Sequence, residues 1–209
     1  MRRLPLFPLP VVLFPGAPMP LHIFEARYRR MVASCVEADS RFGLVYHDPD
    51  RHGPFHTEPG SIGTIAEIAK FQPLPDGRSL ILCRGQERFR IEDGVESGAP
   101  YYEAVVEPYD DEPEDAPRGI AERRRRSVAL FHRVLAEAIG QEPPLPEVRI
   151  DLDPSFTLAR AIKIDPAWQQ TLLEARTERE RLEQIDTLLS SVIDAHARGE
   201  WYPEPDEDE

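Results

Sequence analysis

Residues 1 to about 108 contain short apolar runs bounded by Gly and Pro, and residues 87–92 alternate charged residues with Phe89 and Ile91, a pattern that is typical of β-strands. The expected strands are residues 42–46, 61–71, 79–83, 87–92 and 101–107. Pro75-Asp76-Gly77 predicts a tight turn between the second and third strands, and Gly85 is expected to separate the third from the fourth. Residues 25–38 are the only segment of this half with helical spacing. Strands joined by such turns favour a small antiparallel barrel or sandwich.

Downstream of residue 117 the apolar residues repeat at the spacing of an α-helix. The first predicted helix has one apolar face, made of Val128, Phe131, Leu135 and Ala138, and residues 140–146 end it. The last predicted helix has an apolar stripe that we expect to face the core, made of Leu182, Ile185, Leu189 and Val192.

Three helix starts are marked by capping chemistry. Asp153-Pro154 and Asp165-Pro166 each place a carboxylate acceptor before a proline that suits the first helical position. Residues 177–180, Thr-Glu-Arg-Glu, form a capping box. The C-terminal half is therefore expected to be a small helical bundle.

Together these patterns predict an α+β fold, in which a β-rich N-terminal domain, a barrel or a sandwich, is followed by an α-helical bundle domain. The expected boundaries are a β-rich subdomain at 1–108, an acidic linker at 109–117, a helical subdomain at 118–198 and an acidic tail at 199–209. The basic block Arg123–Arg126 is expected to pair with the acidic residues of 110–115, because four consecutive helical residues cannot form one basic stripe.

Composition narrows the range of functions. The chain has 209 residues and a formal net charge of −13, so we expect no binding to nucleic acid or to an anionic membrane. No run of about 18 apolar residues predicts a transmembrane helix. Four prolines interrupt the apolar N-terminus, which argues against a secretory signal helix. Cys35 and Cys83 are therefore expected to be reduced thiols in the cytoplasm.

Several groups of residues along the chain resemble the LON substrate-binding domain, the N-terminal domain of the ATP-dependent Lon proteases, which also occurs as a stand-alone protein. The opening residues that carry the resemblance are Leu6-Phe7-Pro8-Leu9, Val12-Leu13-Phe14-Pro15-Gly16, Pro20-Leu21-His22-Ile23-Phe24-Glu25, Arg27, Tyr28 and Met31. Those further along are Asp76-Gly77-Arg78, Gly85, Arg88-Phe89-Arg90-Ile91, Tyr101, Gln170-Thr171-Leu172-Leu173-Glu174 and Arg181-Leu182. The resemblance covers about residues 4–193, and residues 47–59 have no clear counterpart.

The resemblance implies that the β-rich N-terminal domain is a pseudo-barrel, a six-strand open barrel, and that an α-helical bundle domain follows it. It also implies a non-catalytic protein that binds unfolded or flexible polypeptides and works with a separate protease. A homodimer is left open. The phosphate-binding loop of the Lon ATPase motor requires a lysine after a glycine, and neither Lys70 nor Lys163 follows one. We therefore expect no ATPase or peptidase activity and no cofactor. The family also implies a partner-facing surface at the first helix, with Glu25, Arg27, Tyr28 and Arg30 as contact residues.

Other candidate sites have simpler interpretations. His47, Asp48, Asp50, His52 and His56 are metal-ligand types, but their spacing fits no common zinc site and the segment is rich in Pro and Gly, so we expect a surface loop without a metal. His22 is expected to be a hydrogen-bonded structural residue, with Glu25 capping the helix after it.

Two alternative functions stay open from the sequence. A stand-alone hydrolase or peptidase would need Cys35 or Cys83 beside a histidine in a cleft, although no G-x-S-x-G elbow is present. A dimerisation or structural module would need a large apolar interface.

Overall fold

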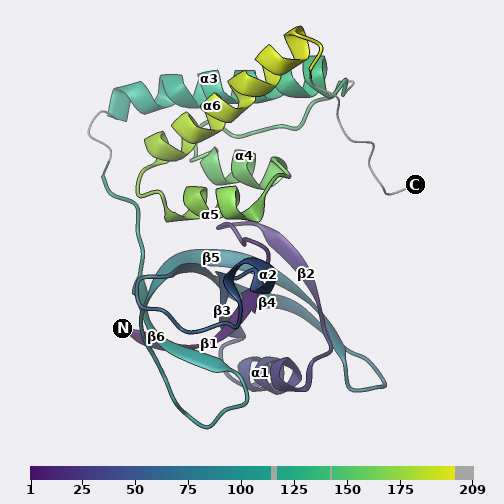
Figure 1. Cartoon of the computed structure of the whole chain (residues 1–209), viewed down its shortest axis with the longest axis vertical. Coiled ribbons are helices and arrows are strands. Elements are labelled where there is room, and N and C mark those ends of the chain that lie inside the picture. Colours follow the sequence, from purple (N-terminus) through teal and green to yellow (C-terminus); the bar gives the residue numbers. More distant parts are fainter. Residues whose placement is uncertain (114–116, 142, 201–209) are drawn as a thin grey trace. The chain divides into compact units, whose positions relative to one another are not determined.

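A computed structural model describes residues 1–113, 117–141 and 143–200. The contacts divide the chain into two compact units, shown in Figure 1. The first, here called the β-rich unit, contains Met1–Asp110 and Lys163–Glu174; the second, the helical unit, contains Asp111–Ile162 and Ala175–Glu209. Part of the acidic linker and the block 204–209 lie outside the described residues.

The β-rich unit is built on one six-stranded sheet, in the order β2-β5-β4-β3-β1-β6. The strands are β1 (Arg2–Leu9), β2 (Pro18–Ile23), β3 (Arg41–Tyr46), β4 (Ile62–Pro73), β5 (Ser79–Gly94) and β6 (Tyr102–Pro108). The helices of this unit are α1 (Ala26–Glu37), the single turn α2 (Pro49–His52) and α5 (Pro166–Glu174). An additional pairing between β5 and β6 closes β1, β3, β4, β5 and β6 into a ring, to which β2 adds at the first half of β5.

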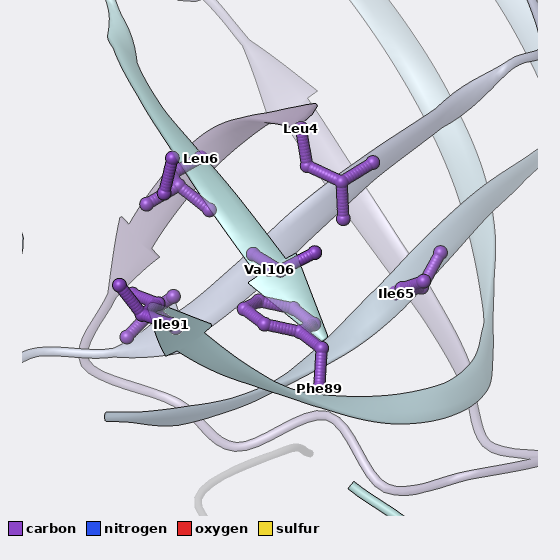
Figure 2. Close-up of a cluster of buried hydrophobic side chains, with 8 residues drawn as sticks. Leu4, Leu6, Ile65, Phe89, Ile91 and Val106 are labelled. Atoms are coloured by element: carbon purple, nitrogen blue, oxygen red, sulfur yellow. The ribbon is translucent and has the colours of Figure 1, made fainter. Parts of the chain in front are cut away.

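The core of the barrel is a cluster of buried aliphatic side chains around Phe89, seen in Figure 2. Phe89 is 1% exposed, and its ring lies over two backbone positions that only glycine leaves open. A Cβ at Gly43 would lie 2.7 Å from Phe89 Cζ, and one at Gly63 would lie 2.6 Å from the same atom. The ring therefore fills the space above two strands that lack side chains there.

β5 runs without a break through Gly85, where the sequence predicted an interruption. Phe14 to Ala17 form a turn in which the amide of Ala17 donates to Phe14 O at 3.1 Å, with Pro15 preset at its second position and Gly16 at a φ of 75°. The amide of Gly16 donates to Gly85 O at 2.8 Å, and the amide of Gly85 donates to Ala17 O at 2.9 Å. Gly85 is thus the point on β5 where this turn docks, and the absence of a side chain permits the approach.

The free edge of β2 has few donors. The carbonyl oxygen of Ala17, just before β2, accepts from the amide of Gly85 on β5. Hydrogen-bonding direction alternates from residue to residue along an antiparallel strand. The backbone polar groups of Pro18, Pro20 and His22 therefore point away from β5. The two prolines have no N–H, which leaves His22 as the one residue of the three that can donate to an added strand. Prolines at this edge protect it from unwanted pairing.

Helix α5 belongs to the β-rich unit although it comes late in the chain. Its last carbonyls are held by side chains of the barrel: Arg88 Nη1 donates to Leu173 O at 2.6 Å, and Tyr109 Oη donates to Glu174 O at 2.8 Å. Gln170 Nε2 donates to Ile62 O at 3.1 Å. The first two bonds satisfy carbonyls that a helix end otherwise leaves open. All three bonds explain why residues 163–174 group with the barrel rather than with the other helices.

The helical unit contains α3 (Pro117–Arg133), the π-helical turn η1 (Val134–Ala138), α4 (Ser155–Ala161) and α6 (Glu178–Ala197). Figure 1 shows α3 and α6 running side by side. Val134 of η1 is buried, whereas Leu135, which the sequence placed on the apolar face, is half-buried. The capping box of Thr177 and Glu180 is present as predicted.

Arg181 of α6 is fully buried and organises the helical unit. Its guanidinium donates to Asp111 at 2.6 and 2.8 Å, to Asp153 at 2.7 Å and to Ser155 Oγ at 2.7 Å, and it lies 4.2 Å from the centre of the Phe156 ring. One cation therefore joins the start of the unit, the residues that lead into α4 and the first turn of α6.

Two arginines of the basic block on α3, Arg123 and Arg124, pair with α6. Arg124 donates to both carboxylate oxygens of Glu178, at 2.6 and 2.7 Å, and Arg123 lies 3.1 Å from Glu183. Glu114 and Asp115, which belong to the predicted partner segment, lie outside the described residues. The pairing with α6 was not predicted, because spacing along the chain does not show that α3 and α6 are adjacent in the fold.

Candidate functional site

The predicted contact residues lie at the start of α1. Glu25 occupies the N-cap position, but its side chain makes no capping bond, so the expected capping role is wrong. Its carboxylate accepts from Arg27 Nε at 2.9 Å instead. The Arg27 guanidinium lies 4.5 Å from the centre of the Tyr28 ring and 6.0 Å from that of Tyr102. Arg30 is exposed on the same helix.

Tyr28 lies buried beneath the other predicted contact residues and forms no part of their surface. Its side chain is only 3% exposed, and its ring centre lies 4.1 Å from that of Phe7. Burial raises the pKa of Tyr28 to about 12, so the phenol stays neutral. The accessible members of the predicted set are therefore Glu25, Arg27 and Arg30.

An exposed apolar face lies next to these charges, on the three-stranded ribbon of β2, β5 and β4. Phe24 is 60% exposed and Leu80 is 43% exposed. His22 pairs with Leu80 across the strands, and its ring centre lies 5.8 Å from that of Phe24. We call Pro20, His22, Phe24, Leu80 and Leu82 the ribbon face. His22 is exposed and makes no side-chain hydrogen bond within the described residues, so the structural role expected for it is wrong.

The histidine segment forms the wall of a second feature, an open pocket of about 440 Å³ in the β-rich unit. Asp48 caps the short helix α2 by accepting from the amide of Asp50 at 3.0 Å, so the segment includes a helical turn that the sequence did not predict. His47 Nε2 lies 2.8 Å from Gly53 O, and His52 Nδ1 accepts from the amide of Asp48 at 3.3 Å. These ring nitrogens bond the segment itself, and no three potential ligands in the described parts of the chain come together as a metal site.

Neither cysteine has the environment of a nucleophile. Cys35 and Cys83 are both buried, and burial raises the pKa of each thiol to about 12, which keeps the thiolate fraction very low at neutral pH. Within the described residues, no hydrogen bond joins either thiol to a histidine. The arrangement that a cysteine hydrolase would need is absent at both positions.

We expect both thiols to be unreactive towards a disulfide reagent such as 5,5′-dithiobis(2-nitrobenzoate) in the folded protein at neutral pH. Burial blocks access and the raised pKa removes the reactive form. The release of the coloured thiolate measures the reaction, and both cysteines should react once concentrated guanidinium unfolds the chain. Fast reaction of either one in the native protein would show that its site is open.

The fold and these surfaces define an α+β protein with a closed β-barrel that presents an apolar face beside a charged helix start. The sequence matches the ATP-dependent protease La (LON) substrate-binding domain over residues 3–191. The chain therefore belongs to this family. None of its described helices has both the length and the apolar character needed to cross a membrane.

Individual relatives agree with this assignment. The Lon protease of Amoebophilus asiaticus is 30% identical over 179 residues, which are 81% of this chain and 21% of that protein. A LON peptidase N-terminal domain and RING finger protein of Schizosaccharomyces pombe is 36% identical over 102 residues, 43% of this chain and 21% of the relative. The crystal structure of a Lon N-terminal domain protein from Xanthomonas campestris superposes with a TM-score of 0.61 and 26% identity, covering 88% of this chain and 97% of the other. The chain thus spans about a fifth of the length of these curated relatives.

Proposed function

We propose that the protein binds unfolded or flexible polypeptide segments without cleaving them, and that the ribbon face is the main contact surface. The observation that carries this proposal is the exposure of Phe24, at 60%, together with that of Leu80, at 43%, on one face of the ribbon. Apolar groups that gather on a surface in this way are typical of interaction sites. Glu25 follows Phe24 directly in the chain, Arg27 and Arg30 follow on the first turns of α1, and the three supply polar contacts at its border.

Two kinds of relative support a binding role. The same family occurs in Lon proteases and in a protein whose name combines the LON N-terminal domain with a RING finger. A domain that occurs in such different proteins is well suited to recognition. We infer that this protein acts as an adaptor that presents clients to a separate protease.

The expected mode of contact is through side chains. Addition of the client as a further strand on β2 is disfavoured, because Pro18 and Pro20 remove two donors from the free edge. An apolar face without strand pairing recognises clients by hydrophobic content rather than by a fixed register, which suits a protein that binds many unfolded segments.

Replacing Phe24 and Leu80 together with serine is expected to weaken binding of an unfolded client, such as a fluorescently labelled casein fragment, by about tenfold or more. Burying a Phe or Leu side chain stabilises a contact by about 1.5–3 kcal/mol, and a factor of ten corresponds to about 1.4 kcal/mol. Fluorescence anisotropy measures the dissociation constant. Because both side chains are exposed, thermal unfolding should stay close to that of the wild type.

Leu152→Ser provides the matched control, since Leu152 is 56% exposed but lies in the helical unit. This variant should bind the client as the wild type does. Equal affinity of the wild type and the Phe24→Ser, Leu80→Ser variant would contradict the proposal, and so would turnover of the client by the purified wild-type protein.

A further inference from the structure

The pocket beside α2 has aromatic walls that are held in fixed orientations. It is lined by the end of β3, the segment that contains α2, the start of β4, and α5. The rings of Tyr46 and His52 meet edge to face with centres 5.9 Å apart, and those of His47 and Phe55 do so at 5.2 Å. Phe55 in turn packs edge to face on Tyr102 at 4.7 Å. The hydrogen bonds of His47 and His52 to the local backbone fix this arrangement.

The charged residues that line the same pocket are acidic. Glu58 and Glu174 both line it and are both exposed, and none of its lining residues is Lys or Arg. Arg51 lies nearby on α2, but it is 3.0 Å from Asp165 and 3.3 Å from Asp48, so its charge is already matched by two carboxylates. The pocket therefore combines uncompensated negative charge with aromatic surface.

The side chain of Gln170 fixes the carboxylate of Glu174 at the wall of the pocket. Gln170 Nε2 donates to Ile62 O at 3.1 Å and to Glu174 Oε1 at 2.8 Å, which uses both hydrogens of the amide. Gln170 Oε1 is buried and has no hydrogen-bond partner among the described residues. Because Gln170 Oε1 is enclosed, the acceptors that this wall offers a ligand are the carboxylate oxygens of Glu174, which these contacts hold in place.

We propose that this pocket binds a cationic side chain, arginine or lysine, of the bound polypeptide. This inference rests on the proposed function and goes beyond it by naming a residue class within the client. A cation is attracted to aromatic faces and forms charge-assisted hydrogen bonds with carboxylates, so the two features of the pocket favour the same ligand. The net charge of −13 adds long-range attraction for basic segments.

The test uses two unstructured peptides of glycine, leucine and phenylalanine that differ only at one central residue, arginine in one and its neutral isostere citrulline in the other. The wild type should bind the arginine peptide about tenfold more tightly, a difference of about 1.4 kcal/mol, because only the cation gains from the aromatic walls and the two carboxylates. The Glu58→Gln, Glu174→Gln variant should lose most of this preference while it keeps its affinity for the citrulline peptide.

A second double variant separates the pocket from the overall charge. Glu37→Gln with Glu96→Gln removes the same number of charges at two exposed positions that do not line the pocket, and it should keep the preference for arginine. Equal binding of both peptides by the wild type would overturn the cationic pocket and leave the proposed function standing. Failure of the wild type to bind either peptide or unfolded casein would overturn both.

Discussion

Replacing Arg181 with methionine is expected to lower the free energy of unfolding of the helical unit by about 3–5 kcal/mol, the usual cost of removing one partner of a buried ion pair. Arg181 is fully buried, and its loss leaves Asp111 and Asp153 facing each other's charge without the cation that holds them at 2.6–2.8 Å. Amide hydrogen exchange of α6 measures the effect within this unit.

The matched control is Arg149→Met. Arg149 bonds Asp151 at 2.5 Å, but both side chains are more than half exposed, and such surface pairs contribute little. We expect α6 to exchange in this control as in the wild type. If Arg181→Met also left the exchange of α6 unchanged, the buried cation would not be the organising centre of the unit.

Replacing Gly85 with alanine is expected to destabilise the β-rich unit by about 3 kcal/mol, because a Cβ at this position has no free space. It would overlap the carbonyl oxygen of Phe14, with the carbonyl carbon of Phe14 only 3.0 Å away and Leu13 Cγ at 3.2 Å. The obstacle is backbone, which cannot turn aside as a side chain would. Urea unfolding followed by the far-ultraviolet circular dichroism of the variant gives the change.

Gly119→Ala is the matched control, the same substitution at a position where a Cβ has free space. A Cβ there would meet no atom closer than 3.7 Å, the guanidinium of Arg179, and Gly119 lies within α3, where alanine is the better helix former. We expect this variant to be as stable as the wild type or slightly more stable. A Gly85→Ala protein with wild-type stability would show that the turn of Phe14 does not dock as described.

Much of the fold was predictable because its signals are local. The capping box at Thr177 and the turn at Pro75-Asp76-Gly77 depend on residues within four positions of each other, and both appear where the sequence placed them. Gly85 was misread because a glycine inside a strand marks either a break or a close approach of backbone, and only the position of Phe14 in space decides between them. The grouping of α5 with the barrel depends on Arg88 and Tyr109, which are far away in sequence.

The candidate site was predictable only in part. The resemblance pointed to Glu25, Arg27, Tyr28 and Arg30, and these residues still await a direct test; the structure shows that Tyr28 is core. Phe24 was missed as a contact residue, although alternation along β2 gave a signal: with Ile23 buried, its neighbour had to point outward. The pocket could not be predicted from the sequence, because its walls come from α2 and from α5, which are more than a hundred residues apart.

Photo-crosslinking from position 24 tests the central claim most directly. A photoreactive phenylalanine analogue, p-benzoylphenylalanine, takes the place of Phe24 in one preparation and of exposed Leu152 in another, and each is irradiated with labelled unfolded casein. We predict a strong covalent adduct from position 24, suppressed by excess unlabelled client, and little adduct from position 152. Equal labelling from both positions, or none from position 24 while the client stays bound, would show that polypeptides are held elsewhere on this protein.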